Sequence, residues 1–447
     1  MKITLIQPAI GKVKEESYVR SWSMYPLNLA VIAGLTPDSH SVDFIDDRFE
    51  DIDYASPRDL VAISVETYTA KRAYSIAEEF RKRRIPVVLG GMHPTLMPEE
   101  ARQHADAIVV GDSEQVWPGL LEDFIRNQLR KGYVAKTERR VLTHVAPRRD
   151  LFRGSKYLPI DLVETGRGCN FSCDFCAVTA THNRTYRTKQ IEAIVQDVES
   201  LEGRNVYFVD DNFISDRRRT KELCRVLAPL RIRWASQGSV NMAEDTQLLE
   251  DLGKSGCFNM LIGFESLNRN TLELMGKGWA TARRSYEEAI RKIRDHGITI
   301  YATFVFGYDA DTKDDFKRTL DFAIDQKFAI TAFNHLVPFP GTPLYARLKD
   351  QGRLLYDNWW LRDNGKFGEV IFQPKNMTPE ELSQCCFEAR ELFYRGSSIF
   401  KRLMDFKTNA KDPITAGYLA WINLFSRKEA KRRQGWPIGE VIQDVSV

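Results

Sequence analysis

The sequence predicts an α/β protein with three parts: an open parallel sheet, a partial barrel of strand–helix units, and a mainly helical carboxyl-terminal region. Short apolar runs alternate with helical patterns up to about Gly352, which is typical of parallel β–α–β units. Polar or glycine-rich turns follow several of these runs. Beyond Gly352 the strand pattern stops while helical patterns continue. We therefore expect domains at residues 1–130, 161–352 and 353–447, with a basic, proline-containing linker at 131–160.

The first domain contains short apolar runs that predict parallel strands. They are Ile3–Ile6, Val42–Ile45, Leu60–Val65, Val87–Leu89 and Ala107–Val110. Ligands of open parallel sheets bind beyond the carboxyl ends of the strands. The turns at those ends offer one candidate set of cofactor-binding residues: Thr67, Gly90, Gly91, His93, Gly111 and Glu114. We call this set the glycine shelf.

The second domain repeats the strand–helix pattern. The predicted strands are Leu162–Thr165, Asn205–Asp210, Ile232–Gly238, Phe258–Glu265, Thr299–Phe306 and Thr331–Pro338. Glycines at 203, 256 and 297 stand where helices should end, and Thr188 and Thr312 stand where helix N-caps belong. Active sites of βα barrels lie at the carboxyl ends of the strands.

Three cysteines, Cys169, Cys173 and Cys176, lie close together directly after the first strand of the second domain. Three thiolates can hold three irons of a cubane iron–sulfur cluster and leave the fourth iron open to another ligand. Structural zinc is the alternative, with His182 as the fourth ligand, although tetrahedral zinc usually takes paired two-residue spacings. A disulfide framework fits poorly, because three is an odd number and the chain is long.

The composition is that of an ordinary globular protein. Of the 447 residues, 43% are hydrophobic and 28% are charged, and the net charge of +3 gives no field that would favour nucleic acid. The amino terminus predicts no signal peptide, and no apolar stretch reaches the roughly 20 residues of a membrane span. Seven cysteines without a pairing pattern suit the reducing cytoplasm, where we expect the protein to reside.

The cysteine spacing, with the aromatic Phe175 just before the last cysteine, resembles the radical S-adenosylmethionine (SAM) superfamily. The resemblance implies a 4Fe–4S cluster whose open iron chelates the amino and carboxylate groups of SAM. One electron, delivered from a donor such as flavodoxin or ferredoxin, then cleaves a carbon–sulfur bond and yields a carbon radical. The residues that the resemblance places near SAM are Phe175, Asp210, Asp211, Ser236, Gln237, Glu265 and Gly307.

The turn Gly90–Thr95, followed by Pro98-Glu99-Glu100, resembles the cobalamin-binding domain that precedes many radical SAM cores. The bacteriochlorophyll ring cyclase and the hopanoid methylases have this layout. The usual Asp-x-His-x-x-Gly signature is absent after the first strand, and Asp38-Ser39-His40 matches it only in part. The resemblance therefore implies cobalamin, on a Rossmann-like domain, without a histidine as its lower ligand. The alternative is a degenerate domain that supports the barrel and binds nothing.

Several other residues are better explained by packing than by chemistry. Cys224, Cys257 and His335 are expected in the core, and His296 near a helix end. A helix starting at Thr378 carries Cys385 and Cys386, for which we expect one buried thiol and one partly exposed neighbour. The segments containing Trp359-Trp360 and residues 366–372 are expected to cover the barrel mouth. The last fifty residues place an aromatic stretch before a basic one, which suits packing on the barrel or contact with a membrane surface.

We therefore predict a radical SAM enzyme that acts as a cobalamin-dependent methyltransferase on an unactivated carbon or phosphorus of a small-molecule or lipid-like substrate. One alternative is a radical SAM enzyme that cyclises, rearranges or transfers another SAM fragment, such as the 3-amino-3-carboxypropyl group, with a purely structural first domain. A non-catalytic cluster- or cobalamin-binding sensor is a further alternative, which the open iron site disfavours.

Overall fold

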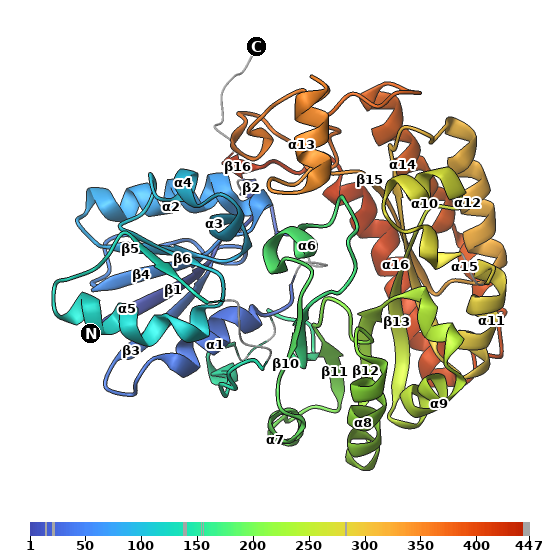
Figure 1. The fold of residues 1–447 in the computed structure, drawn as a ribbon, viewed down its shortest axis with the longest axis horizontal. Helices are drawn as coiled ribbons and strands as arrows, with labels where there is room; N and C mark the ends of the chain where they lie inside the picture. Colours follow the sequence, from blue (N-terminus) through green and yellow to red (C-terminus); the bar gives the residue numbers. More distant parts are fainter. Residues whose placement is uncertain are drawn as a thin grey trace. The chain divides into compact units, whose positions relative to one another are not determined.

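The computed structural model describes residues 1–13, 16–19, 23–136, 141–152, 154, 156–281 and 284–440, so the predicted linker's Arg139-Arg140 pair lies outside it. The chain divides into two compact units (Figure 1). The first unit contains Met1–Leu158, Tyr356–Phe367 and Gly435–Val447, and the second contains Pro159–Leu355 and Gly368–Gln434. The expected separate domain at 353–447 is therefore divided between the two units.

The first unit is built on a six-stranded parallel sheet with the order β3-β1-β4-β5-β6-β7. Its strands are β1 (Lys2–Gln7), β3 (Ser41–Asp46), β4 (Leu60–Ser64), β5 (Val87–Gly90), β6 (Ala107–Val110) and β7 (Gly132–Val134). Its helices are α1 (Leu27–Leu35), α2 (Ala70–Lys82), α3 (Met92–Leu96), α4 (Pro98–Ala101) and α5 (Trp117–Ile125). Five of the strands were predicted. β7 falls within the predicted linker, because three residues are too short for a periodic pattern.

The two ends of the chain meet in the first unit. Strands β2 (Gly11–Lys12) and β16 (Gly439–Glu440) pair in parallel. The buried indole of Trp436 donates from Nε1 to the Gly11 carbonyl at 2.9 Å and packs edge-on against Tyr18. A Cβ at Gly11 would lie 2.3 Å from the Pro437 carbonyl oxygen, so this approach requires glycine.

The second unit contains a six-stranded parallel sheet with the order β15-β14-β13-β12-β11-β8. The strands are β8 (Asp161–Val163), β11 (Asn205–Phe208), β12 (Arg233–Gly238), β13 (Cys257–Glu265), β14 (Thr299–Phe306) and β15 (Ile330–His335). A separate hairpin pairs β9 (Gly166–Gly168) with β10 (Tyr186–Thr188). All six predicted barrel strands are present at nearly the predicted positions.

The helices of the second unit follow its strands in the predicted alternation. They are α6 (Ala177–His182), α7 (Ile191–Glu199), α8 (Arg217–Leu227), α9 (Thr246–Lys254), α10 (Arg269–Leu274), α11 (Tyr286–Asp295), α12 (Lys313–Asp325), α13 (Pro343–Asp350), α14 (Pro379–Phe393), α15 (Gly396–Leu403) and α16 (Pro413–Arg433). Helices α9, α11 and α12 lie on one face of the sheet (Figure 1). No helix among the described residues is long and apolar enough to cross a membrane.

Most predicted helix ends are confirmed. Thr312 and Thr378 cap α12 and α14 with reciprocal capping boxes, and Gly256 and Gly297 adopt positive φ after helices. Two predictions are wrong. Thr188 lies in β10 because the β9–β10 hairpin continues to it, and Gln190 caps α7 instead. Helix α7 ends at Glu199, so Gly203 does not mark the end of this helix.

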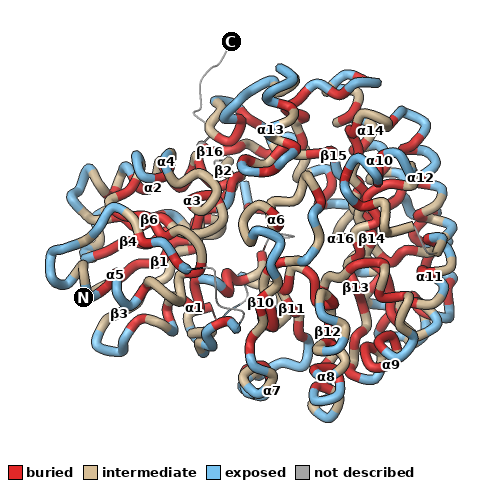
Figure 2. Tube along the Cα trace, in the orientation of Figure 1, coloured by how far each residue is buried: buried red, intermediate tan, exposed pale blue. Residues whose placement is uncertain are grey.

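Burial separates the two faces of the second sheet. Along β12, β14 and β15, residues that face the helices are buried and alternate with partly exposed residues (Figure 2). The partly exposed set forms what we call the inner face, which includes Gln237, Leu261, Tyr301, Thr303 and Asn334. The register pairs Gln237 with Leu261 and Leu261 with Tyr301, so these three residues form one row across the sheet.

The predicted carboxyl-terminal helices pack on the barrel. Leu382, Cys386, Ala389 and Phe393 of α14 are buried, and α14 packs against β15 and α12. Cys386 is buried and Cys385 partly exposed, as expected. In contrast, Trp359 and Trp360 belong to the first unit, where both are buried.

Candidate active site and cofactor sites

The cysteine loop, Cys169–Cys176, connects β9 to α6. Gly168 precedes it with φ +89°, and a Cβ there would lie 2.0 Å from the Thr185 carbonyl oxygen of the neighbouring turn. Only glycine fits this position, so the hairpin fixes the point at which the loop begins. Cys173 is buried, whereas Cys169 and Cys176 are partly exposed.

Residues at the ends of β11 hold the start of the cysteine loop. Asp211 Oδ2 accepts a hydrogen bond from the Gly168 amide at 2.7 Å, and Asn212 Nδ2 lies 3.6 Å from Cys169 Sγ. Asn212 is buried, and its Oδ1 has no partner among the described residues. Burial raises the pKa of Asp211, although the Gly168 amide acts in the opposite direction. The sequence placed Asp211 near SAM. The structure places it beneath the loop.

A second set of contacts holds the end of the loop. Asp174 accepts hydrogen bonds from Tyr308 Oη at 2.5 Å and from Arg347 Nη1 at 2.6 Å, and its amide donates to the Met275 carbonyl at 3.2 Å. The ring of Phe171 stacks on Trp279 with centroids 4.1 Å apart. The loop is thus fixed by β11, by the α10–α11 connection and by the turn after β14, before any cofactor binds.

The thiols fit a cluster better than a single ion. Burial raises the pKa of Cys173 to about 12, and the two other thiols add to the shift, so all three lie within electrostatic reach of each other. Within the residues that the structure describes, no three His, Cys, Asp or Glu side chains close around one metal ion. A cubane cluster binds each thiolate at a different iron and does not require that convergence.

Two of the predicted SAM residues are engaged by the protein itself. Asp210 is buried and accepts from the Thr165 amide at 2.7 Å and from Thr165 Oγ1 at 2.5 Å. Burial raises its pKa to about 7. Ser236 is also buried and donates to the Phe208 carbonyl at 2.8 Å. Both side chains therefore link the end of a strand to a neighbouring backbone segment.

Glu265, at the end of β13, has a different role. Its φ of +65° turns the side chain back over Gly263, where a Cβ would lie 2.0 Å from Glu265 Oε1. Lys277 donates to Glu265 Oε1 at 2.8 Å and to the Gly263 carbonyl at 2.6 Å. Burial disfavours the Lys277 ammonium, but Glu265 and the thiol groups of Cys173 and Cys176 outweigh burial and raise its pKa. Glu265 Oε2 receives no hydrogen bond within the described part of the chain.

The remaining predicted SAM residues are spread around the same strand ends. Gln237 lies on the inner face, and Phe175 contacts Tyr308 edge-on with ring centroids 6.4 Å apart. Gly307 has φ +115°, and its amide donates to Asp311 Oδ2 at 2.9 Å. A Cβ at Gly307 would lie 2.7 Å from Leu382 and 3.0 Å from Phe372, so this glycine packs closely against α14.

The glycine shelf of the first unit exposes backbone. Gly91 and Gly111 have φ of +111° and +83°, and Thr95 links them by donating from Oγ1 to the Gly91 carbonyl at 2.8 Å and accepting from the Gly111 amide at 3.0 Å. A Cβ at Gly90 would meet only Val109, at an ordinary 3.5 Å. The surface above Gly90 is therefore open, which suits a bulky cofactor that approaches the backbone closely.

His93 supports the shelf from below. Its side chain is fully buried, with Nδ1 3.3 Å from Thr67 Oγ1 and Nε2 2.9 Å from Glu100 Oε1. Trp360 Nε1 donates to the two Glu100 oxygens at 3.0 and 3.1 Å, and Tyr74 Oη donates to Oε1 at 2.9 Å. Thr67 is buried in the same network. Glu114 lies partly exposed in the turn after β6.

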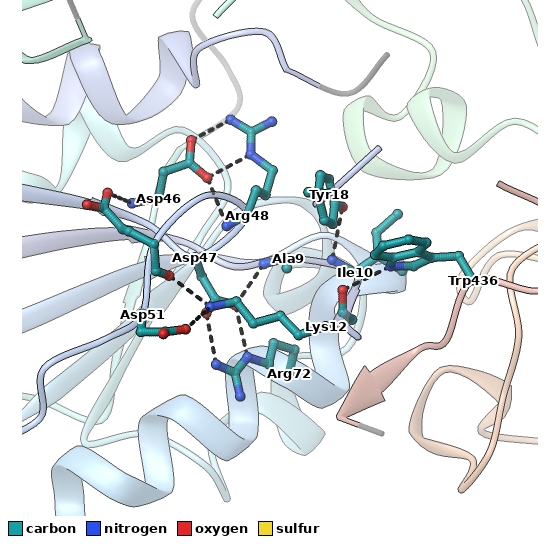
Figure 3. Close-up of polar contacts among 12 residues, drawn as sticks. Ala9, Ile10, Lys12, Tyr18, Asp46, Asp47, Arg48, Asp51, Arg72 and Trp436 are labelled. Carbon is teal, nitrogen blue, oxygen red and sulfur yellow. Dashed lines mark hydrogen bonds and ion pairs between the residues drawn. The ribbon is translucent and has the colours of Figure 1, made fainter. Parts of the chain in front are cut away.

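The loop after β1, where a cobalamin-ligating histidine is usual, is occupied by structural contacts (Figure 3). Asp47 is buried; it accepts from Arg72 at 2.8 and 2.9 Å and from the Ala9 amide at 3.1 Å, and Lys12 lies 3.2 Å from it. Tyr18 Oη accepts from the Ile10 amide at 3.2 Å. Burial opposes ionisation of Asp47, but Arg72 outweighs burial and lowers the pKa. The described part of this loop offers no histidine, as predicted.

The fold and these sites define an enzyme architecture with two cofactor regions, one on an open parallel sheet and one at the carboxyl ends of a partial barrel. Residues 163–323 match the Radical SAM superfamily, and residues 21–121 match the B12 binding domain. The chain is 31% identical over 391 residues to the bacteriochlorophyllide d C-12(1)-methyltransferase of Chlorobaculum tepidum, covering 85% of this chain and 84% of that protein.

The hopanoid C-2 methylase of Rhodopseudomonas palustris is 26% identical over 396 residues, covering 85% of this chain and 73% of the relative. Among solved structures, TsrM from Kitasatospora setae superimposes with a TM-score of 0.62 at 18% identity, covering 86% of this chain and 81% of that one. The chain belongs to the radical SAM enzymes with a B12-binding domain, of the cobalamin-dependent methyltransferase type. Its cofactors are a 4Fe–4S cluster, SAM and cobalamin, and the resemblance stated from the sequence is confirmed.

Proposed function

We propose that this enzyme transfers a methyl group from SAM to an unactivated carbon of a small molecule. The observation that supports the proposal is the 31% identity along 84% of a bacteriochlorophyllide methyltransferase, in a chain that matches both the Radical SAM superfamily and the B12 binding domain. When bound, the cluster supplies one electron to SAM, and cobalamin carries the methyl group. The protein's part is to hold these groups and to position the acceptor.

We assign the chain's residues as follows. Cys169, Cys173 and Cys176 hold the cluster, and the contacts of Asp211 and Asp174 fix their loop. Glu265, oriented by Lys277, accepts from the ribose hydroxyls of SAM through its free oxygen, because a carboxylate only accepts hydrogen bonds. Asp210, Ser236 and His93 position neighbouring backbone and do not touch a ligand. The open backbone at Gly90 and the turns at Gly91 and Gly111 receive cobalamin.

The acceptor is best sought among tetrapyrroles, because the 31% identical relative methylates a bacteriochlorophyllide. The test is incubation of the reconstituted enzyme with SAM, a one-electron donor such as flavodoxin, and either bacteriochlorophyllide d or a hopanoid. A product heavier by one methyl substitution supports methylation, together with one S-adenosylhomocysteine and one 5′-deoxyadenosine per product. Full turnover in cobalamin-free protein would replace this proposal with cyclisation, rearrangement or transfer of another SAM fragment.

A membrane-associated acceptor is favoured by one observation on the second unit. Half of the large hydrophobic residues found exposed lie within residues 392–424: Leu392, Phe400, Met404, Phe406, Ile414, Trp421 and Leu424. Arg427 and Lys428 follow them and are exposed. We infer a cytoplasmic enzyme that contacts anionic lipid through this region. Flotation with anionic liposomes at low salt should carry the wild-type protein upward but not a Phe400→Ser, Trp421→Ser double variant. Equal behaviour of the two proteins would contradict the inference.

A further inference from the structure

The inner face of the second unit carries polar side chains that make no hydrogen bond to the described part of the protein. Tyr207, Gln237, Tyr301, Thr303 and Asn334 come from four different strands and are partly or fully exposed. Within the described ranges, none of these side chains hydrogen-bonds to another residue. Accessible polar side chains that make no hydrogen bond to the protein are available to a polar ligand.

Arg390, on α14, is a cation without a counter-charge. Its Nε donates to the Cys386 carbonyl of its own helix at 3.2 Å, and Nη2 donates to Gln434 Oε1 at 3.2 Å. Gln434 is held in turn by Ser383 Oγ, 3.2 Å from its Nε2. No described carboxylate pairs with Arg390. Arg390 is partly buried, and partial burial removes part of the hydration of its charge.

A second guanidinium connects Arg390 to the inner face. Burial lowers the pKa of Arg390, and Arg433 at the end of α16 acts in the same direction. Burial raises the pKa of Tyr301, and Arg433 acts against that shift. Arg433 directly precedes Gln434, the hydrogen-bond partner of Arg390, so the end of α16 lies beside Arg390. Helix α14 also packs against β15, the strand that carries Asn334 of the inner face. Helix α16 also contacts the partly exposed strand residues at its other end, where Thr415 Oγ1 lies 3.2 Å from Arg233 Nη2 and Tyr418 packs on Phe258.

We propose that Arg390, with Arg433 beside it, binds a carboxylate of the methyl acceptor, and that the inner-face row of Gln237 and Tyr301 contacts the rest of that molecule. A guanidinium presents two parallel N–H donors that match the two oxygens of a carboxylate. The bound carboxylate supplies the counter-charge that the protein lacks. The inference rests on the proposed function in that it takes the inner face as the acceptor site, but the anion site can be tested without turnover.

The first experiment uses propionate and propionamide as probes on the cluster- and cobalamin-loaded enzyme at constant ionic strength. Propionate should raise the midpoint of thermal unfolding of the wild type, and propionamide should not. The increase should vanish in Arg390→Gln and persist in Arg427→Gln, which removes an exposed arginine of α16. Arg390→Lys should retain part of it. Equal stabilisation of the wild type and Arg390→Gln by propionate would overturn the proposal.

A structural role for Arg390 predicts a different result without probe. Because no carboxylate is left unpaired when Arg390 is removed, Arg390→Gln should unfold at least as late as the wild type. Arg402 is a matched structural arginine: it is buried and donates to the Phe328, Ala329 and Phe393 carbonyls and to Asn423 Oδ1. Arg402→Gln should unfold earlier. A loss of stability in Arg390→Gln as large as that in Arg402→Gln would assign Arg390 to the framework.

The second experiment separates the anion site from the reaction. With an accepted tetrapyrrole, the KM of the methyl ester should exceed that of the free acid by about 10- to 100-fold in the wild type, as expected for a charge-assisted hydrogen bond. In Arg390→Gln the two KM values should be equal. If the wild type methylates the free acid and the methyl ester with equal KM values, the anion site is contradicted and the proposed function stands. Arg390-dependent propionate binding without methylation of any acceptor would keep the site and discard the function.

Discussion

The two cofactor regions of this enzyme are built from different chemical groups. The glycine shelf offers backbone, held in shape by positive φ at Gly91 and Gly111 and by the Thr95 hydroxyl between them. The barrel offers side chains: thiols, the Glu265 carboxylate and the Lys277 ammonium. A large cofactor with its own amide groups can be held by shape and backbone. A small charged molecule such as SAM needs charged partners.

In both regions a polar residue of the motif is hydrogen-bonded to the protein itself. His93 is fully buried between Thr67 and Glu100, and Asp210 is buried against Thr165. His93 supports the turn that follows Gly90, and Asp210 directly precedes Asp211, which holds the start of the cysteine loop. A polar residue within a binding motif can therefore contact the ligand or support the neighbouring backbone, and only its hydrogen-bond partners distinguish the two roles.

The sharpest way to separate the two regions is to remove a thiol. Cys173→Ala should abolish the cluster and all reductive cleavage of SAM, because two thiolates cannot hold the cubane. Cobalamin binding should be unchanged. Iron and sulfide content after anaerobic reconstitution measures the effect, with the buried Cys257→Ala as the control. Zinc at near unit occupancy, with iron absent from the wild type, would contradict the cluster assignment.

The reciprocal change adds a side chain to the shelf. Gly90→Val should weaken cobalamin binding by about 10- to 100-fold, the cost of inserting atoms into an occupied contact, while the cluster stays intact. The variant fits the free protein because Val109 is its only close neighbour and the backbone is not strained. Gly119→Val in α5, where a Cβ meets nothing within 4 Å, is the control. Spectrophotometric titration with hydroxocobalamin gives the affinity. Unchanged binding would move the cofactor away from this turn.

A smaller effect is expected from Gly263→Ala. The added methyl group displaces Glu265 Oε1, which lies 2.0 Å from the position of a Cβ, and with it the Lys277 contact. SAM should bind about 10-fold more weakly, equivalent to the loss of one hydrogen bond to a charged group. Equilibrium dialysis with labelled SAM measures this, and Gly417→Ala in α16 serves as the control because its surroundings are open. An unchanged SAM affinity would remove Glu265 from the binding site.

The smallest effect concerns Asp210 and pH. Burial raises the pKa of its carboxyl to about 7 in the folded protein, from an ordinary value of 3.8. Between these values the folded state binds a proton that the unfolded state has lost, so stability falls as pH rises from about 4 to 7. Asp210→Asn should remove most of this decline. Urea unfolding of wild type and variant at several pH values measures the difference. Parallel profiles would show that Asp210 stays ionised.

The alternation of short apolar runs with helical patterns was sufficient to predict the strands, because β-branched apolar runs bounded by glycines have few other interpretations. The cysteine spacing identified the cofactor loop. Lys277 and Arg390 were not found, since a single cation between helical patterns carries no signal of its own. Glu265 was found, but its positive φ and its fold over Gly263 depend on Lys277, which is distant in the sequence. The shelf's dependence on Trp360 lies beyond any local pattern, because the contact spans 260 residues.

The first unit is assembled from segments that are distant in the sequence, and this has a consequence for its folding during synthesis. Its sheet is translated first, but the Trp360 segment and the β16 strand that complete it are translated only after the barrel strands. The sites that Trp360 and Trp436 occupy in the first unit therefore stay unfilled while the barrel strands are being translated. The Trp360 indole reaches Glu100, the partner of His93, only when the far part of the chain has emerged. The polar network that supports the glycine shelf is therefore completed late in synthesis.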